Sequence, residues 1–169
     1  VVVVEHGGQV DQRVAALLAR ARRVGANSEP ILRAMGTTLK SITEGTFNSV
    51  GAAYRPSPWA PKRDGTPSIL QKSTTLAKSF FLTVTSRSAT VGNPMRYAAI
   101  HQFGGEIRPK NAAALRFQSG GRWWTVQKVT MPARPFFPIT SGGEFTSAAV
   151  GLIVRAGERA LSRALRGTP

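Results

Sequence analysis

The sequence contains no cysteine, only two histidines and only 8 acidic residues. Without cysteine the chain has no disulfide, no thiolate metal site and no cysteine nucleophile. His6 and His101 are far apart in the sequence, and no Asp, Glu or second His lies at metal-ligand spacing from His101. We therefore expect neither a metal site nor a bound cofactor.

Sequence motifs of catalysis are missing as well. The chain has no Gly-x-Ser-x-Gly elbow of the kind that presents a nucleophilic serine. Its glycine pairs at 104–105, 120–121 and 142–143 are not followed by Lys-Ser or Lys-Thr, which a phosphate-binding loop requires. We predict that the protein is not an enzyme.

Long apolar runs are the third absence. No stretch approaches the roughly 20 residues that a membrane-spanning helix needs. The four valines at the start lack the basic and apolar segments of a signal peptide. We expect no membrane contact, synthesis inside a cell and, for a chain of 169 residues, a single domain over residues 1–169.

Positive charge is what the sequence has in excess. It contains 23 Lys and Arg residues, which gives a formal net charge of +15, and residues 67–141 include one acidic residue, Glu106. Such an excess attracts nucleic acid, anionic membranes or acidic protein surfaces, or else it forms a solvated surface that keeps the protein soluble. Charge alone does not choose between these possibilities.

The N-terminal part has helical periodicity. Apolar residues recur at steps of three and four over residues 9–24, and again in the segment after Asn27. Asn27 or Ser28 is a suitable N-cap for the second helix. Gly36 and Gly45 weaken that helix, so we expect close packing against a neighbour or a break at these positions.

A proline-rich segment follows the two helices. Residues 51–68 contain four prolines and predict an extended loop or arm. Its one large apolar residue is Trp59, which either fills the domain's own core or anchors the surface of a partner. The basic residues Lys62 and Arg63 follow closely.

The middle of the chain alternates apolar and polar residues. Four segments predict strands: 80–85, 89–91, 115–117 and 122–131. Residues 95–103 fit a short helix with Tyr97 and Ile100 facing inward. Three prolines between residues 131 and 138 exclude a central strand there. The expected fold class is α+β, with a small antiparallel or mixed sheet of about four strands packed against N-terminal helices and a long C-terminal helix.

The C-terminal helix is predicted over residues 141–166. Ser141 and Glu144 stand at capping-box spacing, and an apolar stripe follows them. A row of arginines lies on another face of this helix: Arg155, Arg159, Arg163 and Arg166. The row either complements the helix dipole or contacts a partner.

Residues 96–106 predict a helix-to-loop corner. We expect Gly104 or Gly105 to end the helix in a conformation that only glycine adopts without strain. We expect one ring nitrogen of His101 to hold the corner by donating to a backbone carbonyl. The corner residues are Tyr97, His101, Phe103, Gly104 and Gly105.

Two motifs in this region carry a family resemblance. The segment Tyr97-Ala98-x-Ile100-His101-Gln102-Phe103-Gly104-Gly105 and the later segment Met131-Pro132-Ala133-Arg134-Pro135-Phe136 together resemble the paired signature of the phage virion morphogenesis proteins. These are the tail-completion and neck proteins of Mu-like and related tailed phages. Trp59-Ala60-Pro61 is similar to the tryptophan-bearing loop of the family. The sequence departs from the family at Thr75, where glycine is usual.

The resemblance implies a structural virion protein that forms a ring, expected to be a hexamer, where head meets tail. Such a ring completes the head, terminates the tail or joins the two. The implied partners are further copies of the chain, adjacent neck, connector or tail-tube proteins, and genomic DNA in the channel. The implied location is the virion neck or tail, after assembly in the host cytoplasm.

Specific residues are expected at these contacts. Those expected to touch a neighbouring subunit or partner are Trp59, Lys62, Arg63, Arg134, Phe136, Arg155, Arg159 and Arg163. Those expected to face DNA are Arg108, Lys110, Arg122 and Lys128. The alternative function is a free basic nucleic-acid-binding protein, in which Trp123 and Trp124 stack on bases beside Arg122 and Lys128.

Overall fold

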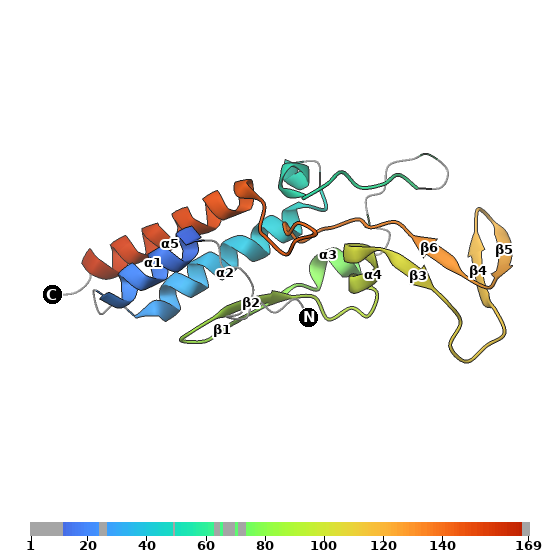
Figure 1. Ribbon diagram of the computed structural model, residues 1–169, viewed down its shortest axis with the longest axis horizontal. Helices are drawn as coiled ribbons and strands as arrows, with labels where there is room; N and C mark the ends of the chain where they lie inside the picture. Colours follow the sequence, from blue (N-terminus) through green and yellow to red (C-terminus); the bar gives the residue numbers. More distant parts are fainter. Residues whose placement is uncertain are drawn as a thin grey trace.

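The chain is elongated, with a helical body at one end and a β-stranded arm at the other (Figure 1). This computed structural model describes residues 12–23, 27–48, 50–62, 65, 70 and 74–166. Helices and small antiparallel sheets are both present, so the predicted α+β class is confirmed. None of the described helices is long and apolar enough to cross a membrane.

Three helices build the body: α1 (Gln12–Arg23), α2 (Ser28–Gly45) and α5 (Ser147–Arg166). Helix α2 packs along α5, and α1 packs against both of them. Close approach depends on Gly157, because a Cβ atom there would lie 2.5 Å from Leu17 Cδ2 and 3.0 Å from Met35 Cγ. The three helices therefore meet closely at this glycine, and a larger residue would require Leu17 and Met35 to move.

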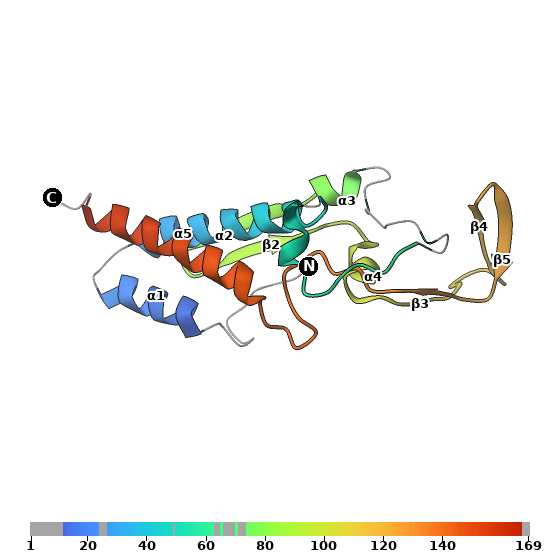
Figure 2. The same ribbon diagram turned by 90° about the horizontal axis from the view of Figure 1, so that it is seen from above.

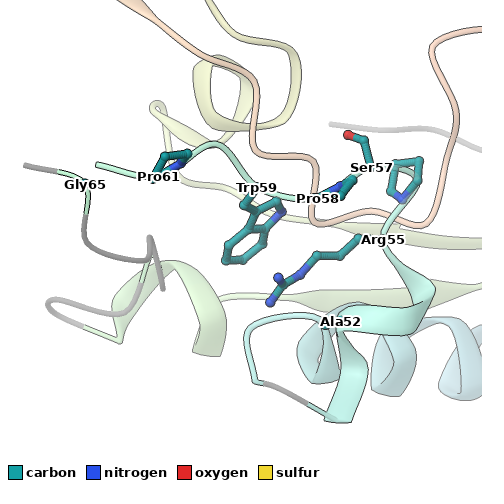
Figure 3. A pocket seen from close by; sticks show the side chains of 8 residues that line it. Ala52, Arg55, Ser57, Pro58, Trp59, Pro61 and Gly65 are labelled. Atoms are coloured by element: carbon teal, nitrogen blue, oxygen red, sulfur yellow. The ribbon is translucent and has the colours of Figure 1, made fainter. Parts of the chain in front are cut away.

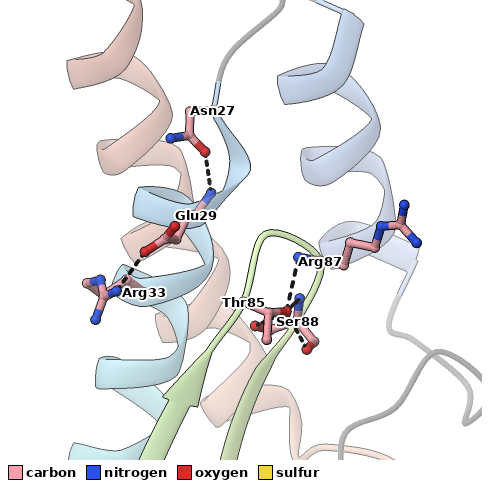
Figure 4. Close-up of polar contacts among 6 residues, drawn as sticks. All are labelled: Asn27, Glu29, Arg33, Thr85, Arg87 and Ser88. Carbon is pink, nitrogen blue, oxygen red and sulfur yellow. Dashed lines mark hydrogen bonds and ion pairs between the residues drawn. The ribbon is translucent and has the colours of Figure 1, made fainter.

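Helix α2 begins where the sequence predicted. The Asn27 side chain accepts a hydrogen bond from the Glu29 amide at 3.0 Å, and Glu29 pairs with Arg33 at 2.7 Å one turn later (Figure 4). Within the helix, a Cβ atom on Gly36 would lie 2.6 Å from Leu82 Cδ1. Close packing at Gly36 is thus confirmed, and the neighbour is a β-hairpin.

That hairpin consists of β1 (Phe81–Val84) and β2 (Ala89–Gly92), which pair antiparallel and lie against α2. Its turn is closed by the Thr85 hydroxyl, which accepts from the amides of Arg87 and Ser88 at 3.2 and 3.0 Å (Figure 4). Both strands and the turn follow the sequence prediction. Local alternation and a turn-forming threonine are sufficient to specify this element.

The strands do not form one sheet of about four strands. The described part of the chain has three separate two-stranded sheets: β1–β2, β3 (Gly105–Ile107) with β6 (Val129–Met131), and β4 (Leu115–Ser119) with β5 (Arg122–Val126). The strand predicted over residues 122–131 is divided at Gln127 and Lys128. Its two halves pair with different partners, and β3 was not predicted.

The C-terminal helix begins later than predicted. Residues 140–144 form a turn in which the Thr140 amide donates to Glu144 O at 2.7 Å and the Thr140 hydroxyl accepts from the Glu144 amide at 3.3 Å. The first helical bond runs from Val150 N to Thr146 O at 3.0 Å. The predicted capping box at Ser141 was wrong because Thr140 and Glu144 close a local turn before α5 starts.

Three short helices connect these elements: η1 (Val50–Tyr54), α3 (Thr75–Lys78) and α4 (Ala98–Phe103). The hydrophobic core of the described residues is formed by α1, α2 and α5 together with the β1–β2 hairpin and the segments that pack against them, and it includes Phe47, Phe80, Phe136 and Phe137. Between Ala98 and Phe136 no described residue joins this core. The chain thus leaves the body after α4, builds the arm, and returns to the core at Phe136.

Candidate functional site

The two family-like motifs meet at the base of the arm. We call this meeting point the junction; it contains residues 59–61, 100–105 and 131–137. Gln102 Oε1 accepts from the amides of Phe136 and Phe137 at 3.0 and 2.9 Å, and the Arg134 amide donates to His101 O at 2.7 Å. The pairing of Gly105 with Met131 then starts the β3–β6 ribbon.

Gly104 makes this close approach possible. It ends α4, as predicted, with a φ of 68° and a hydrogen bond from its amide to Ile100 O at 2.9 Å. A Cβ atom at this position would lie 2.7 Å from Ala133 N and 2.9 Å from Met131 O. Because both neighbours are backbone atoms, no side-chain movement relieves the clash.

Gln102, not the ring of His101, holds the corner. His101 Nδ1 is buried and has no hydrogen-bond partner among the described residues. Burial, and then the positive charge of Arg134, lower the pKa of His101 from its ordinary value of 6.5. The predicted ring-to-carbonyl bond was therefore wrong. The only sequence signal for Gln102 was its position four residues after Ala98, on the buried face of α4.

The aromatic residues of the corner point outward. Tyr97 is 41% exposed and Phe103 is 71% exposed, so the inward orientation predicted for Tyr97 was wrong. The Tyr97 ring contacts the His101 ring edge-on, with centroids 6.0 Å apart. Helix α4 buries Ala98 and Gln102 instead: Ala98 joins the hydrophobic core, and Gln102 binds the amides of the returning segment.

Trp59 packs onto its own chain. Its indole Nε1 donates to Pro135 O at 2.7 Å, and its ring meets the Phe47 ring edge-on at 5.5 Å. The Arg55 guanidinium lies 3.8 Å from the centre of the indole ring (Figure 3). Of the two roles considered for Trp59, the structure shows packing within the chain.

Arg134 fixes the proline-rich loop to the junction. Its Nε donates to Ala60 O at 2.9 Å and one of its terminal nitrogens donates to Pro61 O at 3.0 Å. Arg134 is 7% exposed and Phe136 is 1% exposed. Both were expected to touch a neighbouring subunit, but in this fold they are enclosed by their own chain.

Two hollows lie beside the loop and the body. One, of about 570 Å³, is lined by prolines, Arg55 and Trp59 (Figure 3). The other, of about 450 Å³, has an apolar floor of Ile42, Tyr54 and Leu152 and a rim that includes Thr37 and Ser41. We call the second hollow the body groove; no charged side chain lines it.

The arm, residues 105–131, projects away from the helices and ends in the β4–β5 hairpin (Figure 1, Figure 2). In this hairpin Phe117 stands opposite Trp124, and Gln118 stands opposite Trp123. Because neighbouring positions of a strand face opposite sides, each face of the hairpin carries an aromatic side chain. Phe117 is 38% exposed and Trp123 is 62% exposed. Exposed aromatic surface far from the core is typical of a binding surface.

The basic residues of the arm are partly neutralised. Glu106 pairs with Arg108 at 2.5 Å and with Lys128 at 3.0 Å, so two of the four residues expected to face DNA share one carboxylate. Lys110 and Arg122 are exposed. On the hairpin, the Arg116 guanidinium lies 4.9 Å from the centre of the Trp123 ring.

The remaining predicted contact residues lie in two other places. Arg155, Arg159 and Arg163 are exposed on α5, and Lys62 is exposed in the proline-rich loop. Arg63 lies outside the described residues. The predicted contact set is therefore spread over the loop, the junction and α5 and does not form one patch.

Comparisons with known proteins agree with the motif resemblance. The profile of the phage virion morphogenesis family matches residues 9–150. The chain is 32% identical over 135 residues to Mu-like prophage FluMu G protein 2 of Haemophilus influenzae, a match that covers 79% of this chain and 82% of that protein. No solved structure matches the chain. Within the described residues, no group of three or more His, Cys, Asp or Glu side chains is placed to hold a metal ion.

Proposed function

The chain belongs to the phage virion morphogenesis family, and from this membership we propose that it is a structural subunit that forms a ring, a hexamer, where head meets tail. Its role is assembly and not catalysis. The ring proposal rests on one observation: the arm exposes aromatic side chains and contributes nothing to the described core. A ring gives such an arm a neighbour to bind.

The contact that closes the ring joins two different surfaces. A heterologous contact, in which a patch on one subunit binds a different patch on the next, generates a closed ring when the rotation closes. The apolar floor of the body groove suits the aromatic tip of the arm, and its uncharged lining does not repel Arg116 and Arg122. The hollow beside Trp59 is less suitable because Arg55 lines it.

A disulfide trap tests this contact, and the absence of cysteine gives it a clean background. Phe117→Cys in the arm and Ser41→Cys at the groove are introduced into one chain, and the protein is mildly oxidised. Disulfides need Cα atoms within about 7 Å of each other, so we expect a covalent ladder that ends at the ring size. Phe117→Cys combined with Ser162→Cys on α5 is the matched control. Self-linkage of the Phe117→Cys single variant would indicate a tip-to-tip contact and contradict the proposal.

The place of the ring is tested on phage particles made without this protein. Separate full heads and finished tails in negative-stain images would place the protein at the joint. Overlong tails would make it a tail terminator, whereas joined, infectious particles would contradict a head–tail role. Native mass spectrometry of the purified protein measures the ring size, and a stable monomer at assembly concentrations would contradict the ring.

A second candidate function is binding of single-stranded nucleic acid by the β4–β5 hairpin. The contact of Arg116 with the exposed Trp123 ring favours it, because bases stack on such aromatic and basic surfaces. Trp123→Ala should then weaken binding of a single strand by about 1–3 kcal/mol. Unchanged affinity of this variant would remove the second candidate.

A further inference from the structure

We infer that one face of α5 binds the phosphate backbone of double-stranded DNA. This face, the arginine face, consists of Arg155, Arg159, Arg163 and Arg166, all of which are exposed. At about 100° and 1.5 Å per residue, the four arginines lie within an arc of roughly 80° and span about 16 Å of the helix. Helix α5 runs along the outside of the body, so this length is open to a partner (Figure 1, Figure 2).

The charges of the arginine face are not neutralised within the described chain. The ion pairs of the described residues involve Glu29, Glu44 and Glu106, none of which lies on α5. The one acidic residue of α5, Glu158, is exposed at the edge of the row and forms no ion pair among the described residues, so the face keeps a large excess of positive charge. Like charges spaced four residues apart on a helix repel each other, by about 0.2–0.5 kcal/mol per pair. The neighbouring helix α1 contains no acidic residue, and its last turn adds the exposed arginines Arg20, Arg22 and Arg23. The row is therefore a surface that a polyanion stabilises.

The shape of the row favours duplex DNA over an acidic protein. B-DNA carries about one charge per 1.7 Å of its axis, so about 16 Å of duplex passes roughly nine phosphates. An acidic protein would need a comparable row of carboxylates. All the basic residues of α5 are arginines, whose planar guanidinium groups bind phosphate through two parallel hydrogen bonds.

The same face does not suit a single strand. Single-stranded DNA is bound largely by stacking of its bases on aromatic side chains. Helix α5 contains no aromatic residue. Leu165 is the only large apolar side chain of this helix that is exposed, and the whole helix lies within the described residues. In contrast to the arm, where Glu106 neutralises Arg108 and Lys128, α5 offers charge without stacking surface.

Fluorescence anisotropy with a labelled DNA duplex of about two helical turns, roughly 20 base pairs, tests the inference on the full chain. The α5 variant changes all four arginines to Gln, which keeps helix propensity. The control variant removes the same number of charges at exposed positions outside both the arm and α5: Lys62→Gln, Lys78→Gln, Arg87→Gln and Arg96→Gln. Affinity is measured between about 50 and 200 mM salt, because each phosphate contact adds about 0.9 to the slope of log affinity against log salt.

We expect the α5 variant to bind the duplex at least tenfold more weakly and to reduce the slope by about 3 to 4, while the control variant changes both much less. A further variant with the four arginines changed to Lys keeps the charge and should keep the slope. Equal losses in the α5 and control variants would overturn the inference, since net charge alone would then explain binding. Displacement of the duplex by polyglutamate at equal charge concentration would also overturn it and assign the face to an acidic protein.

Two measurements separate this inference from a folding defect and from the ring proposal. Urea unfolding should give the α5 variant a stability close to that of the unchanged protein. Native mass spectrometry should give the same ring size for both. Loss of the ring in the α5 variant, with duplex binding retained, would assign the arginines to a subunit contact and overturn the inference while leaving the ring itself supported.

Discussion

At the scale of single residues, Gln102 connects two parts of the chain that are more than thirty positions apart. Its side-chain oxygen accepts from the amides of Phe136 and Phe137, both of which belong to the core. Gln102 and both phenylalanines are buried, so the loss of this oxygen would leave two buried amides without an acceptor. The returning segment is thus held to α4 by the Gln102 side chain and by the bond from the Arg134 amide to His101 O.

Gln102→Ala should lower the free energy of unfolding by roughly 2–5 kcal/mol, because it leaves two buried amides without an acceptor. The measurement is a urea unfolding curve followed by circular dichroism. Gln127→Ala makes the same change at an exposed position and should alter stability by less than about 0.5 kcal/mol. Equal effects of the two substitutions would contradict the role assigned to Gln102.

His101 should make stability depend on pH. Its pKa in the folded chain is lowered from 6.5 by burial and by Arg134, so the unfolded chain binds this proton more readily. The contribution of neutral His101 is therefore complete above about pH 6.5 and is lost as the pH falls below it. Urea midpoints measured from about pH 8 to pH 5 should fall less steeply in His101→Gln. The same pH dependence in both proteins would rule out this explanation.

At the scale of elements, the end of α4 and the turn of the arm hairpin each contain a glycine in the left-handed region. Gly104 has a φ of 68° and Gly120 a φ of 60°. A Cβ atom at Gly104 would collide with the backbone of residues 131 and 133, whereas nothing lies within 4 Å of the same atom at Gly120. Substitution at Gly120 therefore measures the cost of the backbone conformation alone, whereas substitution at Gly104 measures that cost together with a steric clash.

Gly120→Ala should cost about 1–2 kcal/mol, which is the conformational penalty alone. Gly104→Ala should cost several kcal/mol more or prevent folding, because the β3–β6 ribbon must move away from α4. Urea unfolding measures the global effect, and hydrogen exchange of the β3–β6 amides shows whether the ribbon has opened. Similar costs at the two glycines would show that the junction accommodates a Cβ atom.

Elements defined by nearby residues could be predicted from the sequence. The Asn27 cap, the β1–β2 hairpin and the end of α4 at Gly104 depend on groups a few positions apart. The β3–β6 pairing and the outward position of Tyr97 could not, since both result from contact between segments distant in the sequence. The start of α5 was missed because two local motifs competed and the Thr140 turn prevailed.

At the scale of the whole molecule, the arm lies in the sequence between two segments that both belong to the body. Residues before 98 and after 136 share the core, and Ile107 and Val129 are paired neighbours in the ribbon. The sequence motifs marked both sides of the junction as one paired family signature, but the sequence analysis did not predict that the two segments are in contact. They did not indicate that Arg134 and Phe136 hold the subunit together from within, because a motif shows which residues matter and not which atoms they contact.

Replacing residues 108–128 with Asn-Gly should give a folded body without a functional arm. The two residues form a type I′ turn that joins Ile107 to Val129 with the existing strand register. We expect helical circular dichroism and cooperative urea unfolding to be retained and the ring to be lost in native mass spectrometry. Phe117→Ser, which leaves the length of the arm unchanged, should weaken the ring without removing the arm. A ring formed by the shortened chain would refute the arm contact.

The side-by-side position of Ile107 and Val129 also bears on how such chains diverge. The β3–β6 ribbon already holds the two ends of the arm together. Each doubling of the number of residues between Ile107 and Val129 therefore costs only about 0.6 kcal/mol in loop-closure entropy. The reach of the arm is thus nearly independent of the stability of the body. An insertion or deletion in this one segment can therefore leave every core residue in place.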